Sequence, residues 1–259
     1  MPARVNSHNT QDPCEFICLG QTEYTGALAR QRAVQSAKLA NPDFLDTVFF
    51  VEHPGVYTLG RRGGRENLMV SQTFLDDRGI QVIQIDRGGN ITYHGPGQAV
   101  LYPVIDLEKH HLSIPDYVNG LEEIMKQTCR QFGVSAHRDI RNPGLWVKNA
   151  KIGSVGISLK RGIAIHGLAL NINPDLTPFS WINPCGLPSL AMTSIARETG
   201  RAERTLGHPS PPEAVSLMKT VCHSFAQYFS EVFNIPLQKQ GKPDQQKSDK
   251  NKDACHAHL

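Results

Sequence analysis

Residues 144–172, GLWVKNAKIGSVGISLKRGIAIHGLALNI, decide the fold of this chain. They hold three apolar runs, 144–147, 151–159 and 163–172, whose composition and length predict β-strands. Only residues 148–150, with a turn at Lys148-Asn149, and the segment 160–162 separate these runs. Because connections this short join neighbouring antiparallel strands, the stretch predicts a three-stranded meander.

Working outward from the meander, strands and helices interleave without strict alternation. This pattern favours an α/β (α+β) fold, one domain with a mixed sheet flanked by helices, over a doubly wound sheet. The predicted strands are 15–19, 46–53, 81–86 and 99–107, and the predicted helices are 24–40, 115–133 and 211–233.

The composition is that of a soluble globular protein, with 39% hydrophobic and 20% charged residues in 259. A net charge of +3 gives no support to nucleic-acid binding. No apolar run suggests a membrane span or a secretory signal, so we expect a cytoplasmic protein. We expect a flexible N-terminus over 1–13, one catalytic domain over 14–239 and a disordered polar tail over 240–259.

The six cysteines are spread along the chain, and only Cys14 and Cys18 lie close together. Without a second such pair we expect no metal site, and free thiols are expected in place of a disulfide framework. Cys129 and Cys222 lie on helical apolar stripes and are expected to fill the core. Cys185 lies in the rigid, non-periodic turn 181–190, WINPCGLPSL, where it is either a nucleophile or a structural cysteine.

A nucleophilic thiol needs a base, and His94, His166 or a lysine could supply it. Lys151 is the unusual lysine, because strand alternation places it on the apolar face that carries Val155, Ile157 and Leu159. Burial there would lower its pKa and make it a usable acid or base. The alternative is a strand-end lysine whose ammonium group reaches water.

The stretch 87–98, RGGNITYHGPGQ, is rich in glycine and lies between two predicted strands. It precedes no helix, so it matches neither a dinucleotide-binding nor a phosphate-binding loop. We interpret it as a wide turn whose backbone approaches a ligand, with Arg87, Thr92 and His94 as its polar groups. A plain hairpin bend with a core histidine is the alternative.

A basic cluster, Arg61, Arg62 and Arg65, follows a predicted strand close to this turn. Such clusters usually lie in solvent, but this one could also receive an acidic protein or a phosphate.

Five motifs in order resemble the lipoyl(octanoyl) transferase family over about residues 15–237. They are EHPGVYTLGR (52–61), RGGNITYHGPGQAVLYPVIDL (87–107), KIGSVGI (151–157), HGLALNI (166–172) and INPCGL (182–187). The resemblance implies the fold shared by the catalytic domains of lipoate-protein and biotin-protein ligases. It also implies transfer of an octanoyl group from octanoyl-acyl-carrier protein to a lysine of lipoyl domains, in 2-oxoacid dehydrogenases and the glycine cleavage H protein. This is the first step of endogenous protein lipoylation.

The resemblance further implies roles for individual residues. Cys185 would carry the acyl group as a thioester, and Lys151 would tune that thiol and move protons. The acyl pocket would be lined by Arg87, Gly88, Gly89, Asn90, Ile91, Thr92, Tyr93, His94, Ser154, Val155, Gly156, Gly167, Leu168 and Ala169. No cofactor would be needed, because a thioester donor is already activated.

Two alternatives compete with this function. An ATP-dependent lipoate-protein ligase of the same fold would adenylate a free acid and use no cysteine nucleophile. A non-catalytic acyl-binding module would need the pocket, but not Cys185 together with Lys151.

Overall fold

The structure is a computed structural model that describes residues 12–139, 142–184, 190–201 and 212–239. Cys185, nearly all of the expected flexible N-terminus and the expected polar tail lie outside the described residues. Asp12, at the inner end of that N-terminus, forms an ion pair with Lys109 over 2.9 Å.

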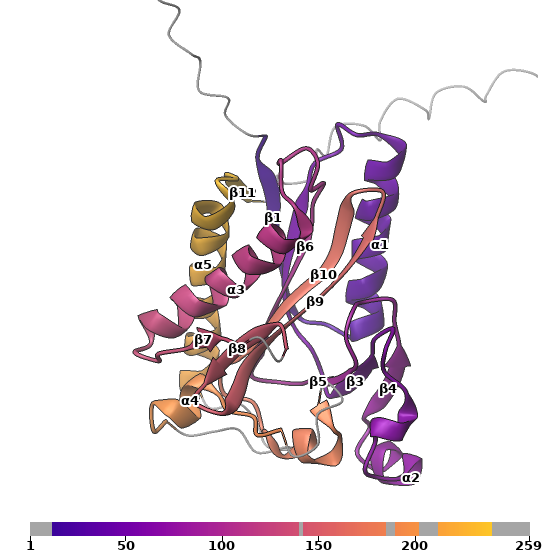
Figure 1. Ribbon diagram of the computed structural model, residues 1–259, viewed down its shortest axis with the longest axis vertical. Coiled ribbons are helices and arrows are strands. Elements are labelled where there is room, and N and C mark those ends of the chain that lie inside the picture. Colours follow the sequence, from indigo (N-terminus) through magenta and orange to yellow (C-terminus); the bar gives the residue numbers. More distant parts are fainter. Residues whose placement is uncertain (1–11, 140–141, 185–189, 202–211, 240–259) are drawn as a thin grey trace, which may run out of the picture.

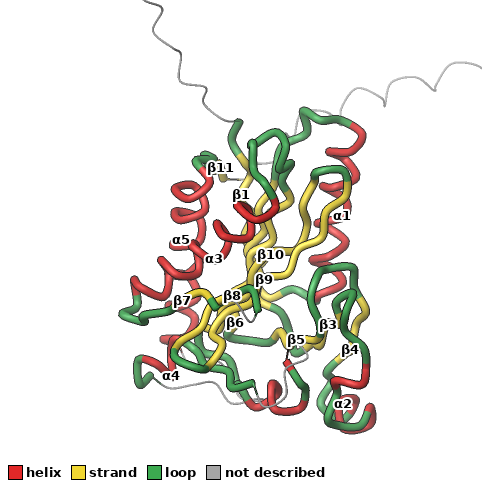
Figure 2. Tube along the Cα trace, in the orientation of Figure 1, coloured by secondary structure: helices red, strands yellow, loops and turns green. Residues whose placement is uncertain are grey.

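A mixed eight-stranded sheet runs through the molecule (Figures 1 and 2). Its parallel pairs join β1 to β11 and to β2, and its remaining neighbours are antiparallel. The order across the sheet is β11 (Leu237–Lys239), β1 (Cys14–Gln21), β2 (Thr47–Glu52), β6 (Gln98–Val104), β10 (Ile163–Asn171), β9 (Ala150–Lys160), β8 (Gly144–Val147) and β7 (His137–Arg138). The predicted meander is confirmed as β8, β9 and β10.

Helices cover both faces of this sheet (Figure 1). Helix α1 (Tyr24–Ala40), which has the predicted bounds, packs on one face, and α3 (Ile114–Gln131) and α5 (Pro212–Phe233) pack on the other. The side chain of Ser113 caps the start of α3 by accepting from the N–H of Asp116. Gly133 ends this helix region at φ +77°, a conformation that glycine adopts without strain.

Apolar side chains fill the space between the sheet and the pair α3 and α5. The aromatic side chains Phe225 and Phe229 of α5 are fully buried there, together with Cys129 of α3. The expected core role of Cys129 is therefore confirmed. None of the helices in the described part of the chain combines the length and apolar character that crossing a bilayer requires.

A second, three-stranded sheet lies beside the first, in the order β4 (Gln81–Gln84), β3 (Val56–Leu59) and β5 (Ile91–His94). Our interpretation of 87–98 as one wide turn was therefore partly wrong, because β5 is a strand that pairs antiparallel with β3. Rings of Tyr57 and Tyr93 pack together at 5.3 Å in the cluster beneath this sheet. The short helical segments are η1 (Arg65–Asn67), α2 (Gln72–Asp76), η2 (Thr177–Trp181) and α4 (Ile195–Glu198).

Strand β9 carries a β-bulge where it meets β8. Leu145 pairs with Gly153, but the next residue of β8, Trp146, pairs with Lys151, so Ile152 is the extra residue. Ile152 belongs to the core beneath α3.

The bulge changes which side of the sheet Lys151 faces. A Cβ on Gly153 would stand 2.6 Å from Met125 Sδ of α3, so Gly153 and Ile152 both face that helix. Lys151 faces the opposite side. The predicted face, shared with Val155, Ile157 and Leu159, was wrong because regular alternation does not continue through a bulge.

Candidate active site

A pocket opens on the side of the sheet that α1 covers. Strands β9 and β10 form one wall, and the segment 87–94 forms another. It is lined by Tyr24, Arg87, Gly89, Asn90, Ile91, Thr92, His94, Val100, Tyr102, Asn142, Lys151, Ser154, Val155, Gly156, His166, Gly167, Leu168 and Ala169. The structure thus brings together Lys151 and most of the residues expected to line an acyl pocket.

Two of the expected residues do not line the pocket. Tyr93 is buried on the other side of β5, where its ring contacts Tyr57 and Phe179. Gly88 instead holds the segment in place, because its N–H donates to the carbonyl oxygen of Ile157 over 2.9 Å.

Arg87 braces the segment against the sheets. Its guanidinium donates to the carbonyl oxygens of Gly88 and Thr58 over 2.9 and 2.8 Å, and also to the Thr58 hydroxyl. A Cβ on Gly156 would stand 3.1 Å from Arg87 Cδ and 3.4 Å from the carbonyl oxygen of Gly88, so a larger residue there would crowd the segment. Close approach of two backbones explains glycine at this position.

Lys151 is fully buried at one end of the pocket. Its ammonium group donates to Asn142 Oδ1 and to the carbonyl oxygen of Pro143, the latter over 2.9 Å. It also lies 5.5 Å from the centroid of the Trp146 ring. These contacts satisfy the buried amino group, so the alternative of a lysine that reaches water was wrong.

The backbone of Lys151 is tied to the segment that follows Cys185. Its N–H donates to the carbonyl oxygen of Ala191 over 2.9 Å, and its own carbonyl accepts from Thr193 over 3.0 Å. Ala191 is six residues after Cys185.

His94 is held in a hydrogen-bond network whose direction can be assigned. Gln98 Nε2 donates to Asn171 Oδ1 over 2.9 Å, so Gln98 Oε1 is the acceptor that lies 2.7 Å from His94 Nδ1. The proton of His94 is therefore on Nδ1. Burial lowers the pKa of His94 to about 3, with a smaller contribution from His53, so the ring is neutral.

Four buried aromatic side chains meet at the pocket: Tyr24, Tyr102 and His166 line it, and His53 contacts Tyr24 and Tyr102. His53 Nε2 lies 2.9 Å from the Tyr102 hydroxyl, and the Tyr24 hydroxyl lies 3.4 Å from His166 Nδ1. His166 Nε2 lies 3.2 Å from Asp86 Oδ1, which holds the pKa of Asp86 well below its usual range. Of these four, the sequence analysis named only His166, because the others meet through tertiary contacts alone.

His166 has a left-handed backbone conformation, with φ +61°. Its N–H donates to Gln31 Oε1 of α1 over 2.8 Å. Non-glycine residues in this conformation are uncommon and cluster at functional sites.

The basic cluster joins the segment 87–94 through its backbone. The N–H groups of Arg61 and Arg62 donate to the carbonyl oxygens of Arg87 and Gly89 over 3.0 and 3.1 Å. The Arg61 side chain donates to Ser158 Oγ over 3.0 Å, and all three arginines of the cluster are exposed. The exposure of these arginines agrees with the interpretation that the cluster lies in solvent. It does not test whether the cluster receives an acidic protein or a phosphate.

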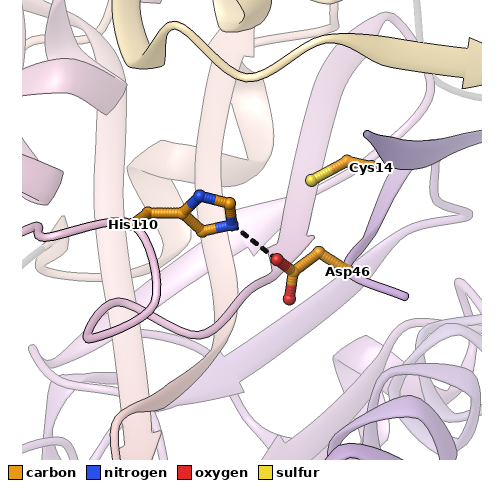
Figure 3. Close-up of side chains that lie close together, drawn as sticks. All are labelled: Cys14, Asp46 and His110. Atoms are coloured by element: carbon orange, nitrogen blue, oxygen red, sulfur yellow. Dashed lines mark hydrogen bonds and ion pairs between the residues drawn. The ribbon is translucent and has the colours of Figure 1, made fainter. Parts of the chain in front are cut away.

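One group of metal-ligating atoms exists elsewhere among the described residues, formed by Cys14, Asp46 and His110 (Figure 3). Its carboxylate is already engaged, since Asp46 Oδ1 lies 2.6 Å from Lys38 Nζ and Oδ2 lies 2.5 Å from His110 Nε2. Burial raises the pKa of the Cys14 thiol, so the thiol stays protonated. A lysine ammonium in this position neutralises the carboxylate, so the group is a buried ion pair.

Cys222 packs against the core, as expected, but it is only partly buried. Its Sγ lies 2.8 Å from Sγ of the exposed Cys18 on β1. The apolar stripe of α5 is nevertheless present, and Val221, Phe225 and Phe229 form its buried centre.

Comparisons with known proteins agree with this arrangement. Residues 23–216 match the family "Lipoyl protein ligase A/B catalytic domain". The chain is 48% identical over 187 residues to an octanoyltransferase of Desulfotalea psychrophila, covering 71% of this chain and 84% of the relative. It is 38% identical over 232 residues to an octanoyltransferase of Caldicellulosiruptor bescii, covering 88% and 96%.

Solved structures share the fold. A lipoate-protein ligase A bound with ATP superposes with a TM-score of 0.63 at 17% identity, covering 88% of each chain. A bipartite lipoate protein ligase from Thermoplasma acidophilum superposes with a TM-score of 0.59 at 16% identity, covering 88% of this chain and 87% of that one. The expected single α/β fold of lipoate-protein ligases is therefore confirmed. With a matching family model and close relatives along most of its length, this chain belongs to the lipoyl(octanoyl) transferase family of lipoyl protein ligase A/B catalytic domains, and it is an acyltransferase.

Proposed function

We propose that this enzyme transfers an octanoyl group from octanoyl-acyl-carrier protein to a lysine of a lipoyl domain, through a thioester on Cys185. One observation carries the proposal: a pocket with an apolar middle has a buried lysine at one end, and the chain around Lys151 is bonded to the segment that follows Cys185. The relatives named octanoyltransferase support the acyl group. The ligase solved with its E2 lipoyl domain supports the acceptor.

The first half of the reaction loads the enzyme. Lys151, in its neutral form, accepts the proton of the Cys185 thiol, and the thiolate attacks the thioester carbonyl of the donor. The carbon–sulfur bond to the carrier breaks as the bond to Cys185 forms. The carrier thiolate takes a proton from Lys151 and leaves as a thiol.

The second half transfers the acyl group to the acceptor. A neutral lysine amine of the lipoyl domain attacks the Cys185 thioester, an amide bond forms and Cys185 is released. The amine loses one proton, which restores the thiol. Lys151, which is buried beside the pocket, would pass this proton.

Ser154, Val155, Gly156, Gly167, Leu168 and Ala169 would enclose the acyl chain along β9 and β10. The segment 87–94 would close over it, braced by Arg87. We keep the cytoplasm as the proposed compartment, in line with the free thiols of Cys14, Cys18, Cys129 and Cys222.

Intact-protein mass spectrometry tests the proposal. After incubation with octanoyl-acyl-carrier protein we expect one octanoyl adduct, which disappears when a lipoyl domain is added. Cys185→Ala should give no adduct and no transfer. Cys129→Ala is the matched control, because it removes a buried thiol of α3 and should keep the adduct at a stability cost on the order of 1 kcal/mol.

A ligase is the second candidate, favoured by the shared fold with a lipoate-protein ligase bound to ATP. The ligase would transfer free octanoate only when ATP is present, and it would not use the acyl-carrier thioester. Activity with octanoate plus ATP, retained in Cys185→Ala, would replace our proposal with this one.

A further inference from the structure

Two thiols outside the pocket lie in contact with each other. The Sγ atoms of Cys18 on β1 and Cys222 on α5 are 2.8 Å apart, although the two residues are separated by 204 positions in the chain. A disulfide bond measures about 2.05 Å, so the sulfurs need to approach each other by only about 0.8 Å. We propose that Cys18 and Cys222 are a modification site, at which a low-molecular-weight disulfide converts the two thiols into a reversible disulfide that ties β1 to α5.

Core packing holds the two cysteines opposite each other. Cys18 is level with Phe50 in the strand pair β1 and β2, and the Phe50 ring packs edge-on against Phe225 of α5 at 5.9 Å. Cys222 precedes Phe225 by three residues, so it lies one helical turn away on the same side of α5. Cys14 belongs to the core that contains Phe225, and Cys18, four residues later on the same strand, faces the same way.

Cys18 is the thiol that starts the reaction. It is exposed, so a small disulfide can reach its sulfur, whereas Cys222 is only partly accessible. The hydrogen bond from Cys222 lowers the pKa of Cys18 to about 7, and the same bond raises the pKa of Cys222. Because the thiolate is the nucleophile in thiol–disulfide exchange, Cys18 attacks first and Cys222 follows.

The exchange takes two steps. The Cys18 thiolate attacks one sulfur of the reagent, the bond between the two reagent sulfurs breaks, and a mixed disulfide forms as one thiolate leaves. This thiolate takes the proton of Cys222, whose sulfur attacks Cys18 Sγ and releases the second half of the reagent. That half leaves as a thiol with the proton that Cys18 had given to water. Two protein thiols are thereby oxidised, and one reagent disulfide is reduced to two thiols.

The buried thiols of the core do not compete in this exchange. Cys14 and Cys129 are fully buried, and burial raises the pKa of both thiols, that of Cys129 to about 12. Thiols that stay protonated and out of reach of water are inert toward small disulfides. Within the part of the chain that the structure describes, the reaction therefore begins at Cys18.

The new bond ties the first strand of the domain to its last described helix. It encloses nearly the whole catalytic domain in one covalent loop, because 204 positions separate the two cysteines. A disulfide restricts the unfolded chain more strongly when the loop that it closes is longer. Oxidation should therefore raise the melting temperature by at least about 5 °C, and reduction should reverse the gain.

The experiment treats the folded, reduced enzyme with glutathione disulfide and maps its disulfides by mass spectrometry after trypsin digestion. We expect a cross-link between the peptides 5–30 and 220–239, which carry Cys18 and Cys222. Peptide 5–30 also contains Cys14, so fragmentation of the cross-linked pair should place the bond at Cys18. Dithiothreitol should remove the cross-link and return the melting temperature to its starting value.

Matched variants separate this bond from other effects of oxidation. Cys18→Ser and Cys222→Ser each remove one partner, so oxidation should give neither the cross-link nor the rise in melting temperature. Cys222→Ala serves as a second variant if Cys222→Ser does not fold. Cys129→Ala removes a thiol from α3 and should keep both the cross-link and the rise.

Four results would overturn the proposal: no reaction at Cys18, a mixed disulfide at Cys18 that never passes to Cys222, a cross-link to another cysteine or to a second chain, or a cross-link that fails to raise the melting temperature. Neither Cys18 nor Cys222 lines the pocket, so each of these results is independent of whether the enzyme transfers an octanoyl group.

Discussion

The ammonium nitrogen of Lys151 lies 2.9 Å from the carbonyl oxygen of Pro143, in a position with no exposure to solvent. An ammonium group held by neutral acceptors can give up a proton, whereas a guanidinium cannot near neutral pH. If Lys151 moves protons as proposed, Lys151→Arg should lower turnover by roughly two to four orders of magnitude. Steady-state transfer rates on a protein shown to be folded by circular dichroism give the answer.

Lys148→Arg is the matched control for this substitution. Lys148 is exposed in the turn between β8 and β9, three residues before Lys151, and the same change there should leave turnover within about twofold. Near-normal turnover of folded Lys151→Arg would reduce the lysine to an electrostatic role.

Stability should fall as the solution is acidified below pH 6.5. Burial lowers the pKa of His53 to about 4 and that of His94 to about 3, while an unfolded chain keeps both near 6.5. Between these values the unfolded chain binds protons that the folded chain does not. Each histidine then costs about 1.4 kcal/mol of unfolding free energy per pH unit.

Urea unfolding at half-unit steps from pH 7.5 to 5 measures this slope. His53→Asn should reduce the slope by the contribution of one proton, even if it lowers stability at every pH. A slope that is identical in this variant would mean that His53 is already protonated in the folded enzyme.

Asp46→Asn should destabilise the fold strongly. The Lys38 and Asp46 side chains are 1% and 3% exposed, and their charged atoms lie 2.6 Å apart. Burial alone would raise the pKa of Asp46, but hydrogen bonds from His110 and Lys38 outweigh it and lower the pKa, so the carboxylate is charged. Loss of one partner leaves a buried unpaired ammonium, at a cost of about 3–5 kcal/mol.

A double variant checks the origin of this cost. Lys38→Met combined with Asp46→Leu removes both charges, and it should be less destabilised in urea than the sum of the two single variants. Additive costs would show that packing volume, and not the unpaired charge, dominates.

Cys18 should react with iodoacetamide with a midpoint near pH 7. A hydrogen bond from Cys222 lowers the pKa of Cys18 to about 7, although burial acts in the opposite direction. Cys222→Ala removes the donor, so the midpoint should rise toward the ordinary value of about 8.5. Peptide mass spectrometry after short pulses at pH 5–9 follows this site separately, and Cys129, fully buried, is the internal control that should stay unmodified.

The sequence predicted correctly those helices and strands that are determined by local apolar periodicity and turn residues. Helix α1 has the predicted bounds, and each end of the meander strands lies within one residue of the prediction, because apolar periodicity and turn residues define them. The sequence analysis missed strand β3, because its four residues follow Pro54-Gly55 and resemble the end of the preceding strand. The sequence analysis also missed strand β5, because it lies inside a glycine-rich stretch and its strand conformation comes from pairing with β3.

The residues of the candidate pocket also fall into those that the sequence predicted and those that it missed. Motif residues on β9, on β10 and in the segment 87–94 were predicted as a group, and the structure gathers most of them. Tyr24 and Tyr102 were not predicted as pocket residues, because an aromatic residue at a helix start or inside a strand cannot be distinguished from a core residue by sequence. The side of the sheet that Lys151 faces depends on a one-residue bulge, which strand alternation alone cannot reveal.

Strand β1 lies between β11 and β2, and Cys14 pairs with Leu237. The two ends of the catalytic domain are therefore neighbouring strands, about 4.8 Å apart. Because these strands are parallel, Lys239 lies beside Phe16, so a linker back to Asp12 would have to run the length of β11. New ends could then be opened in the exposed turn at Lys148-Asn149 without breaking the order of the sheet. Circular permutation is thus open to this enzyme, and so is insertion of the whole domain into a surface loop of another protein.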